Sequence, residues 1–481
     1  MFESLSDAGV VDAITSASRE ENAGCGQKLK WMGELYARHA PEDDDEKVQW
    51  AIDGHANVVA EISAALNISR GRAAGQLRYA IDLGEKLPKV AELFAAGAID
   101  FRMMAELVNR SENVTDSEIL AKLDAAFAQW SPKWMKMSGP KLTERIGMWV
   151  EKFDPAGVRE PRPARDNRYV EIGPGAPGMA NVWASLTLTE GAALDERIDQ
   201  VAATVCGNDP RTKDERRADA VMAMSNHETR LQCGCGSSDC PASGGGENKP
   251  LGEVVLHVLA EQAAVDGDSQ NPGYLPGFGA VPAPLLRGLV DSGKAKINPL
   301  KIPPPECEPR YRPSTALAEF VRWRDLTCRW PGCDVPAAKC QIDHTVPYPL
   351  GPTHPSNNKL YCPHHHLLKT FYVGAGGWSE RQLPDGTLIL TAPTGHVYTT
   401  TPGGAQFFSQ LATPTGELVI PDQPEPPSPT RGMMMPKRKR TRAQDRAYRI
   451  ALERQHNAAR IARKQLLLSE RIARDDEPPP F

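Results

Sequence analysis

The amino-acid sequence predicts a multidomain protein with a mainly α-helical N-terminal region, a mixed α/β middle, a small metal-supported module and a basic helical tail. Three observations predict this class. Apolar residues recur at helical spacing through the first part of the chain, and short β-rich runs flank a helical run in the middle. Paired cysteines and histidines crowd residues 328–369. A chain of 481 residues is long enough for two or three domains with their own cores.

Composition shifts and proline-rich stretches give the expected boundaries. They are a helical N-terminal domain at 1–153, a mixed α/β region at 168–300, a Pro-rich linker or brace at 301–318, the metal module with C-terminal hairpins at 319–400, and a second Pro-rich linker with the basic tail at 421–481.

Helix signals are regular in the first domain. Pro88 and Gly97 bracket one helix, Asp100 caps the next, and Thr115-x-x-Glu118 is a capping-box candidate for a third. One apolar stripe is expected to be buried: Val48, Ile52, Val59, Ile62 and Leu66.

The middle region is predicted to be mixed. After an exposed connection at 154–167, Arg168 to Ile172 and Asn181 to Leu188 resemble strands, and Glu190 to Val205 resembles a helix. Glu253 to Leu259 is another strand candidate.

Three cysteines lie close together in a Gly/Ser-rich loop of this region: Cys233, Cys235 and Cys240. They could hold a second metal if a fourth ligand, such as Cys206, comes from elsewhere in the chain. A flexible loop with free thiols is the alternative.

Two residue pairs in the module have zinc-ligand spacing. Cys328 and Cys333 flank a Pro-Gly turn, and Cys362 and His365 lie one helical turn apart. Four such ligands close a tetrahedral structural Zn²⁺ site without an open position. Cys340 could replace one of the first pair, and the run His364 to His366 leaves the register open by one residue.

A second group of polar residues lies between and just after these pairs: Asp343 beside His344, then Asn358, His366 and Lys369. Carboxylate and imidazole ligands suit Mg²⁺ or another divalent ion at an open site. A strand over Lys339 to Thr345, a loop, and a helix from Cys362 to about Thr370 would bring these side chains towards one point.

At these residues the sequence resembles the HNH endonuclease superfamily, which has a ββα-metal fold. The resemblance implies a metal-dependent nuclease in which His344 is the general base. It also implies that Asp343 and His366 hold the catalytic divalent ion and that Asn358 fixes the loop that orients His344. Lys369 would contact a phosphate. The sequence departs from the commoner pattern, because Cys-x4-Cys replaces Cys-x2-Cys and His365 takes the place of a fourth cysteine.

Other interpretations remain open for these residues. The zinc candidates could be free thiols with a surface histidine, and Asp343-His344 could be a surface acid beside a core histidine. A zinc module whose nuclease activity has been lost would leave a nucleic-acid-binding or assembly protein.

The segment from Met1 to about Leu300 resembles the N-terminal domain of unknown function that precedes an HNH module in a large, repeated actinobacterial family. Three stretches carry the resemblance: 87–97, 209–220 and 276–282. The resemblance implies no activity for this domain.

The charge distribution is asymmetric. Between residues 437 and 474 thirteen Lys and Arg face three Asp and Glu, a net charge of +10, whereas the whole chain carries −5 and the remainder therefore −15. A basic helix of this kind can contact DNA phosphates without sequence preference. A solvated, partly disordered helix is the alternative, and the scattered apolar residues disfavour a membrane surface.

These observations predict a cytoplasmic DNA endonuclease. The chain begins without a recognisable signal peptide and has no run long enough to span a bilayer, and its clustered cysteines suit metal binding in a reducing compartment. Sequence specificity, the identity of the catalytic ion and the oligomeric state are not predicted.

Overall fold

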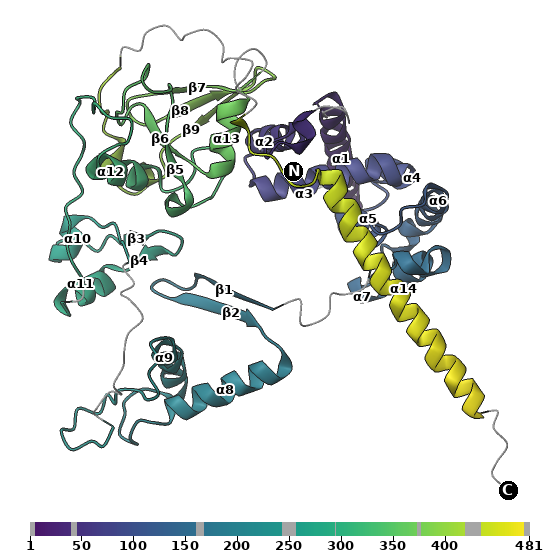
Figure 1. Cartoon of the computed structure of the whole chain (residues 1–481), viewed down its shortest axis with the longest axis horizontal. Helices are drawn as coiled ribbons and strands as arrows, with labels where there is room; N and C mark the ends of the chain where they lie inside the picture. The colour runs from purple at the N-terminus through teal and green to yellow at the C-terminus, as the bar shows by residue number, and fades with distance from the viewer. Residues whose placement is uncertain are drawn as a thin grey trace. The chain divides into compact units, whose positions relative to one another are not determined.

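The computed structural model describes residues 5–39, 46–159, 168–242, 256–293, 295–372, 377–418 and 434–475. The chain forms two compact units, Met1–Glu160 with Pro299–Phe481, and Pro161–Asn298 (Figure 1). Each unit is described by itself below.

The first unit begins with a helical domain, as the sequence predicts. Its core is one continuous apolar cluster to which α1 to α7 contribute, including Leu77, Phe94 and Phe127. The helices are α1 (Asp7–His39), α2 (Gly54–Leu66), α3 (Arg70–Lys86), α4 (Pro88–Ala95), α5 (Phe101–Arg110), α6 (Ser117–Trp134) and α7 (Gly139–Phe153), with short 3-10 turns at Glu46–Gln49 and Pro155–Gly157.

Local capping explains where several of these helices begin and end. Asp100 caps α5 by accepting the N–H of Met103 at 2.7 Å, and Gly97 adopts a positive φ of 72° just beyond α4, as predicted. The capping box at Thr115 is wrong by one residue. Asp116 is the N-cap of α6, since its carboxylate accepts the free N–H groups of Glu118 at 2.9 Å and Ile119 at 3.0 Å.

The expected apolar stripe is only partly correct. Val59 and Ile62 are buried in α2, and Ile52 is buried just before it. Leu66 is 40% exposed because it ends the helix, and Val48 lies in the preceding 3-10 turn instead of on the same helix.

A small α/β module follows in the same unit. It contains α12 (Thr315–Asp325), a 3-10 turn (Ala337–Lys339), β5 (Gln341–His344), β6 (Asn358–Tyr361) and α13 (Pro363–Phe371), then a sheet of β7 (Ser379–Gln382), β8 (Leu388–Thr391) and β9 (Val397–Thr400), and two 3-10 turns (Gly404–Gln406, Ser409–Ala412). Strands β5 and β6 pair antiparallel, and α13 packs against both. The predicted hairpins are present, with Gly386 at φ 81° in the turn between β7 and β8.

A buried ion network connects α12 to β6 in this module. Asp325, fully buried, accepts hydrogen bonds from Arg324 at 2.8 Å, Arg329 at 3.1 Å and the backbone N–H of Leu360 at 2.9 Å. Both arginines are also buried and donate to backbone carbonyls, so the network is satisfied inside the protein and fixes the start of the Cys328–Cys333 loop relative to β6.

The helical domain and the module touch through their side chains. The indole N–H of Trp378 donates to Asn57 Oδ1 at 2.8 Å. Ser63 Oγ, which donates its proton to the carbonyl of Ile68 at 2.6 Å, lies 3.5 Å from the carbonyl of Pro331. Gly332, at φ 72°, lies so close that a Cβ there would come within 2.3 Å of the carbonyl of Ile68. The loop between Cys328 and Cys333 therefore packs directly on the helical domain.

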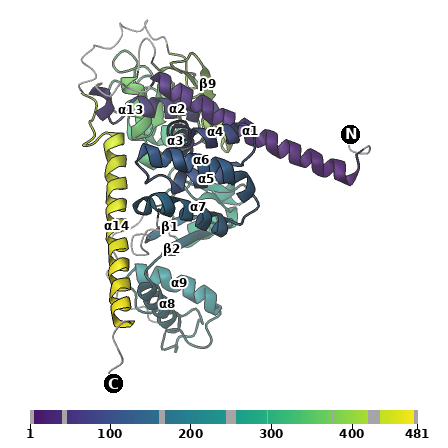
Figure 2. The ribbon, with the colours of Figure 1, turned by 90° about the vertical axis from the view of Figure 1, so that its right-hand side faces the viewer.

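The basic tail forms one long helix, α14 (Arg442–Asp475), and returns to the helical domain (Figure 2). Arg442 pairs with Asp53 at 2.6 Å, and Arg454 pairs with Asp154 at 2.5 Å. Two further ion pairs join Arg438 to Asp53 at 2.9 Å and Arg446 to Asp82 at 2.6 Å. The predicted Pro-rich linker at 421–429 lies outside the described residues.

The second unit is mixed, in agreement with the sequence. It contains β1 (Tyr169–Pro174), β2 (Ala180–Ser185), α8 (Leu188–Ala202), α9 (Lys213–Ser225), α10 (Gln262–Asp266), β3 (Gly273–Leu275), β4 (Gly279–Val281) and α11 (Ala283–Asp291). Strands β1 and β2 form one hairpin, β3 and β4 another, and α8 packs against α9. Of the strand expected at 253–259, residues 253–255 lie outside the described residues and Leu259 forms an isolated bridge with Tyr274.

Among the described residues, no helix combines the length and the apolar character needed to cross a membrane.

Candidate metal centre

Four predicted zinc ligands come together in the module. The ligand atoms of Cys328, Cys333, Cys362 and His365 all lie within 4.8 Å of one another. His365 Nδ1 is 3.4 Å from both Cys328 Sγ and Cys362 Sγ. Three thiols and one imidazole are a usual donor set for a closed tetrahedral site, so this group can hold a metal ion such as zinc.

The local sequence explains why these side chains converge. The turn at Gly332 brings Cys333 back towards Cys328, whose sulfur accepts the N–H of Cys362 at 3.3 Å. Cys362 is the N-cap residue of α13, with Pro363 at the first helical position. Trp330 stacks on the His365 ring at 4.7 Å between centroids and holds it against the thiols.

The three consecutive histidines point to three different places. His365 faces the thiols, His366 faces Asp343, and His364 Nδ1 lies 3.5 Å from Arg70. The sequence left open which of the three histidines joins the cysteines, and in the structure it is His365. Cys340 is buried nearby but its thiol donates to the carbonyl of Val335, and it is not part of the four-residue group.

The charge of the cysteine group is shared unequally. Hydrogen bonds from Cys328 and Cys333 hold the pKa of Cys362 far below its usual value, whereas burial raises the pKa of Cys328 well above it. One thiolate stabilised by neighbouring thiols attracts a cation. A bound cation would in turn favour loss of the protons of the remaining thiols.

The second predicted group is assembled around Asp343. Its Oδ1 is 3.3 Å from His366 Nε2, and its Oδ2 accepts hydrogen bonds from Lys359 at 2.9 Å and Lys369 at 2.8 Å. Glu380 shares both lysines, at 2.7 Å and 3.3 Å. Burial alone would raise the pKa of Asp343, but the two ammonium groups and His366 hold its pKa far below the usual value.

His344 lies on the opposite face of β5 from Asp343, because neighbouring residues of a strand point to opposite sides. Its Nε2 is 2.8 Å from Thr353 Oγ1, and Tyr311 stacks on its ring at 5.3 Å between centroids. The structure thus pairs Asp343 with His366 directly, whereas His344 lies on the other face of the strand with Thr353 and Tyr311, so the side chains do not all meet at the one point that the sequence predicted.

These contacts define the tautomer of His344. Thr353 Oγ1 donates its only proton to the backbone carbonyl of Arg310 at 2.6 Å, so it can only accept from His344. His344 Nε2 therefore carries the proton, and its lone pair is at Nδ1. Burial lowers the pKa of His344, which keeps the ring neutral at pH 7.

The loop between β5 and β6 is fixed mainly by Asn357. Its side chain accepts the N–H of Val346 at 2.8 Å and donates to the carbonyls of Val346 at 3.0 Å and Pro352 at 2.9 Å. Asn358, to which the sequence argument gave this role, pairs with His344 across the sheet but uses its side chain only to accept the N–H of His354 at 2.9 Å. Both residues brace the loop, and Asn357 takes the larger part.

The segment expected to be a Pro-rich linker is a brace. The carbonyl of Pro305 lies 3.1 Å from His354 Nε2, and Glu308 pairs with Thr353 through a backbone bridge. With Tyr311 on the His344 ring, the segment encloses one side of the site.

Sequence reasoning missed several residues of this site. The side chains of Lys359 and Glu380 are 1% and 7% exposed. Lys359 contacts Asp343, and Glu380 contacts Lys359 and Lys369. Lys359 stands opposite Asp343 in the β5–β6 register, but the sequence predicted only the first of these two strands. Glu380, Thr353 and Tyr311 have no sequence signal, because each reaches the site through the tertiary fold.

Comparison with known proteins identifies relatives but no activity. A family model described as a domain of unknown function, DUF222, matches residues 16–325. The chain is 43% identical over 477 residues to the uncharacterized protein Rv3776 of Mycobacterium tuberculosis strain H37Rv, covering 94% of this chain and 90% of that protein.

Two other similar proteins come from the same species. The uncharacterized protein Rv2100 is 41% identical over 498 residues, with 95% of this chain and 89% of that protein covered. An uncharacterized protein in the est 3' region is 37% identical over 338 residues, with 65% of this chain and 95% of that protein covered. No solved structure matches the chain. The family model covers more than half of the residues, and this chain therefore belongs to the DUF222 family.

Proposed function

We propose that the protein is a metal-dependent endonuclease of the HNH type that hydrolyses phosphodiester bonds in DNA. The observation that supports this most is the approach of His366 Nε2 to within 3.3 Å of Asp343 Oδ1, with His344 next to Asp343 on the same strand. A carboxylate and an imidazole at this separation can share one divalent ion. The cysteine group at the start of α13 would hold zinc and keep His366 in place.

His344 would act as the general base through Nδ1. Because its Nε2 is engaged by Thr353, Nδ1 is the atom that can take a proton from the attacking water. Asp343 and His366 would hold the divalent ion, while His344, on the other face of β5, would take the proton of the water that attacks in line with the leaving oxygen. When bound, a divalent ion would offset the charge that develops on the phosphate and the leaving oxygen.

The basic helix α14 would supply weak, sequence-independent contacts to DNA. Arg438, Arg442, Arg446 and Arg454 are engaged by carboxylates of the helical domain, so their charge is partly neutralised. Residues beyond this stretch, such as Arg463 and Lys464, are exposed. We assign the sequence-independent phosphate contacts of the tail to this distal part of the helix, and these contacts would give a salt-dependent affinity for DNA.

A second candidate is a zinc-containing nucleic-acid-binding or assembly protein whose HNH-like module is inactive. One observation favours it: Lys359 and Lys369 already neutralise Asp343, and Glu380 completes a buried network that is stable without a divalent ion. In that case the ion pairs around Asp343 are purely structural, and no divalent ion binds there.

Cleavage of supercoiled plasmid by the zinc-loaded protein, with and without Mg²⁺, Mn²⁺ or Ni²⁺, separates the two. A nuclease converts the plasmid to nicked or linear DNA only with the ion, and His344→Ala abolishes this conversion while zinc content and folding stay unchanged. His396→Ala is the matched control, since His396 is an exposed histidine of the same module, next to Thr394 and outside the proposed site.

Two results would contradict the proposed nuclease function. If His344→Ala cuts as well as the wild type, the general-base assignment is wrong. If no ion supports cleavage while the protein retains zinc and salt-sensitive DNA binding, the binding-module proposal replaces it.

A further inference from the structure

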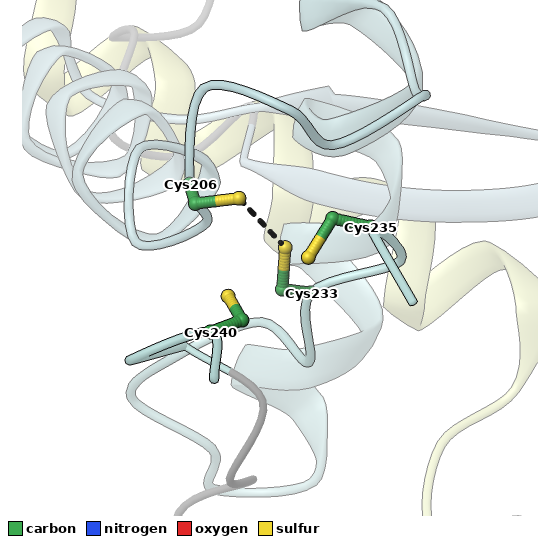
Figure 3. A group of neighbouring side chains, drawn as sticks. All are labelled: Cys206, Cys233, Cys235 and Cys240. Carbon is green, nitrogen blue, oxygen red and sulfur yellow. Dashed lines mark hydrogen bonds between the residues drawn. The ribbon is translucent and has the colours of Figure 1, made fainter. Parts of the chain in front are cut away.

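The second unit contains another group of converging cysteines. Cys206 follows α8, and Cys233, Cys235 and Cys240 lie in the loop after α9. Their four sulfur atoms lie within 4.8 Å of one another, and Cys206 Sγ is 3.5 Å from Cys233 Sγ (Figure 3). We infer that these four cysteines bind a second structural Zn²⁺ as a closed four-thiolate site.

The separation of the sulfurs fits a metal better than a disulfide. Four thiolates around zinc at about 2.3 Å lie roughly 3.8 Å apart at tetrahedral geometry. A disulfide needs sulfurs about 2.0 Å apart, and none of the four cysteines forms one with any described residue. Figure 3 shows the thiols directed towards a common point from two separate chain segments.

Backbone N–H groups point at the sulfurs in a repeated pattern. The N–H of Asn208 donates to Cys206, that of Ser237 to Cys235, and that of Ala242 to Cys240 at 3.4 Å. In each case the donor lies two residues beyond the cysteine. The first cysteine group has the same feature, where Val335 donates to Cys333. Donors of this kind favour the thiolate over the thiol and orient the ligands of a metal.

A carboxylate locks the two cysteine-bearing segments together. The Asp209 side chain, which is fully buried, accepts from Arg211 at 2.8 Å and from the backbone N–H of Gly234 at 2.8 Å. Arg211 also donates to the carbonyl of Gln232 at 2.8 Å, and the N–H of Leu231 donates to Thr204 Oγ1 at 2.9 Å. The segment before α9 is thereby fixed to the loop that carries Cys233.

This network gives a structural reason for the 209–220 stretch that carries the family resemblance. Asp209 and Arg211 frame the cysteines, and Thr212 with Glu215 forms a capping box that starts α9. Arg217 pairs with Asp199 and so joins α9 to α8. The stretch positions the ligands from outside, as supporting residues of a metal site do.

The hydrophobic core around α8 and α9 is small, so a metal site there would add stability. The apolar cluster between α8 and α9 contains only Val201, Ala202, Ala220, Ala223 and Leu231 as buried members among the described residues. Three of these five are alanines, and so little buried apolar surface stabilises a fold weakly. Zinc binding at the end of the helix pair would add free energy of folding directly, since the unfolded chain lacks a preformed site.

Metal content of the full-length protein tests the inference. We expect two zinc ions per chain in the wild type, one in Cys233→Ser/Cys235→Ser, and one in Cys328→Ser/Cys362→Ser. Cys25→Ser and Cys307→Ser, outside both groups, should keep two. One zinc per chain that is lost with Cys328 and Cys362 and unaffected by Cys233 and Cys235 would overturn the inference.

Thiol alkylation of the wild-type protein gives a second readout that needs no variant to fold. Exposed Cys307 should react with iodoacetamide at once, whereas Cys206, Cys233, Cys235 and Cys240 should react only after a chelator is added. Alkylation of these four at the rate of Cys307 in zinc-replete protein would overturn the inference. Neither measurement depends on nuclease activity, so the second zinc site and the proposed function can fail separately.

Discussion

The Asp343 carboxylate lies between His366, at 3.3 Å, and the ammonium group of Lys359, at 2.9 Å. A divalent ion at the proposed site would compete with a lysine for this buried carboxylate. The proposal therefore makes the affinity for an ion depend on the charge balance around Asp343, which can be measured directly.

Lys359→Met should increase the affinity of the site for Mn²⁺ by roughly tenfold, which corresponds to about 1.4 kcal/mol. The substitution removes the positive charge that Asp343 and Glu380 share, and it keeps the apolar part of the side chain. Calorimetric titration with Mn²⁺ measures the change, and Lys339→Met, at an exposed lysine of the same module, is the control. An unchanged affinity would show that Lys359 and the ion do not compete for Asp343.

Cys362→Ser should remove the zinc of the first cysteine group and unfold the module, because α13 begins at this residue and both proposed sites depend on α13. Zinc analysis and thermal unfolding of the variant measure both effects. Cys307→Ser, at an exposed cysteine outside the group, should lose neither zinc nor stability. A folded Cys362→Ser protein with full zinc content would contradict the assignment.

Gly332→Ala should destabilise the first unit by several kcal/mol, through backbone strain of about 1–3 kcal/mol and an additional steric clash. The new Cβ would lie 2.3 Å from the carbonyl oxygen of Ile68 and push the Cys328–Cys333 loop off the helical domain. Gly395→Ala separates the two causes: Gly395 has φ 84° but no atom near the new Cβ. Equal losses in denaturant unfolding would show that the contact with Ile68 contributes nothing.

Asn357→Ala should reduce stability by about 1–3 kcal/mol and lower the cleavage rate, because three hydrogen bonds across the β5–β6 loop are lost. Asn358→Ala should cost less, about 1 kcal/mol, since its side chain makes one such bond and its Nδ2 is buried without a partner among the described residues. Thermal unfolding and plasmid cleavage rank the two variants. The opposite order would return the loop-fixing role to Asn358.

The folding stability of the first unit should fall in two steps as the pH falls. Burial, with Arg442 adding to it, lowers the pKa of His55 to about 4, so the folded state resists a proton that the unfolded chain takes up near pH 6.5. Stability therefore falls between about pH 6.5 and 4. Burial alone would raise the pKa of Asp53, but Arg442 and Arg438 lower it below the usual 3.8, so its contribution is present above that pH and is lost further down.

Thermal unfolding of the full-length protein across pH 7 to 3 checks this order. His55→Gln should remove the part of the loss between pH 6.5 and 4 that His55 contributes, and Asp53→Asn should weaken α14 already at pH 7. Unfolding curves for His55→Gln that show the same pH dependence as the wild type would contradict the role given to His55.

Local chemistry made much of this protein predictable. Helix signals such as Pro88, Gly97 and Asp100 act within one or two turns. The spacing of Cys328, Cys333, Cys362 and His365 is typical of a tetrahedral metal site, and their ligand atoms do come together. The predicted strand, loop and helix are present for the same reason, since hydrophobic period and turn residues determine them over short distances.

The sequence by itself determined the elements, the first cysteine–histidine group and the basic character of the tail. Only the tertiary structure decided which charges meet: Lys359 and Glu380 at Asp343, Tyr311 on His344, and Arg454 of α14 on Asp154. It also brought Cys206, which the sequence offered only as a candidate, to the other three cysteines of the second group. These partners are far apart in the chain, and a pair of opposite charges carries no sequence pattern that says which of many possible partners will lie within about 3 to 4 Å once the chain has folded.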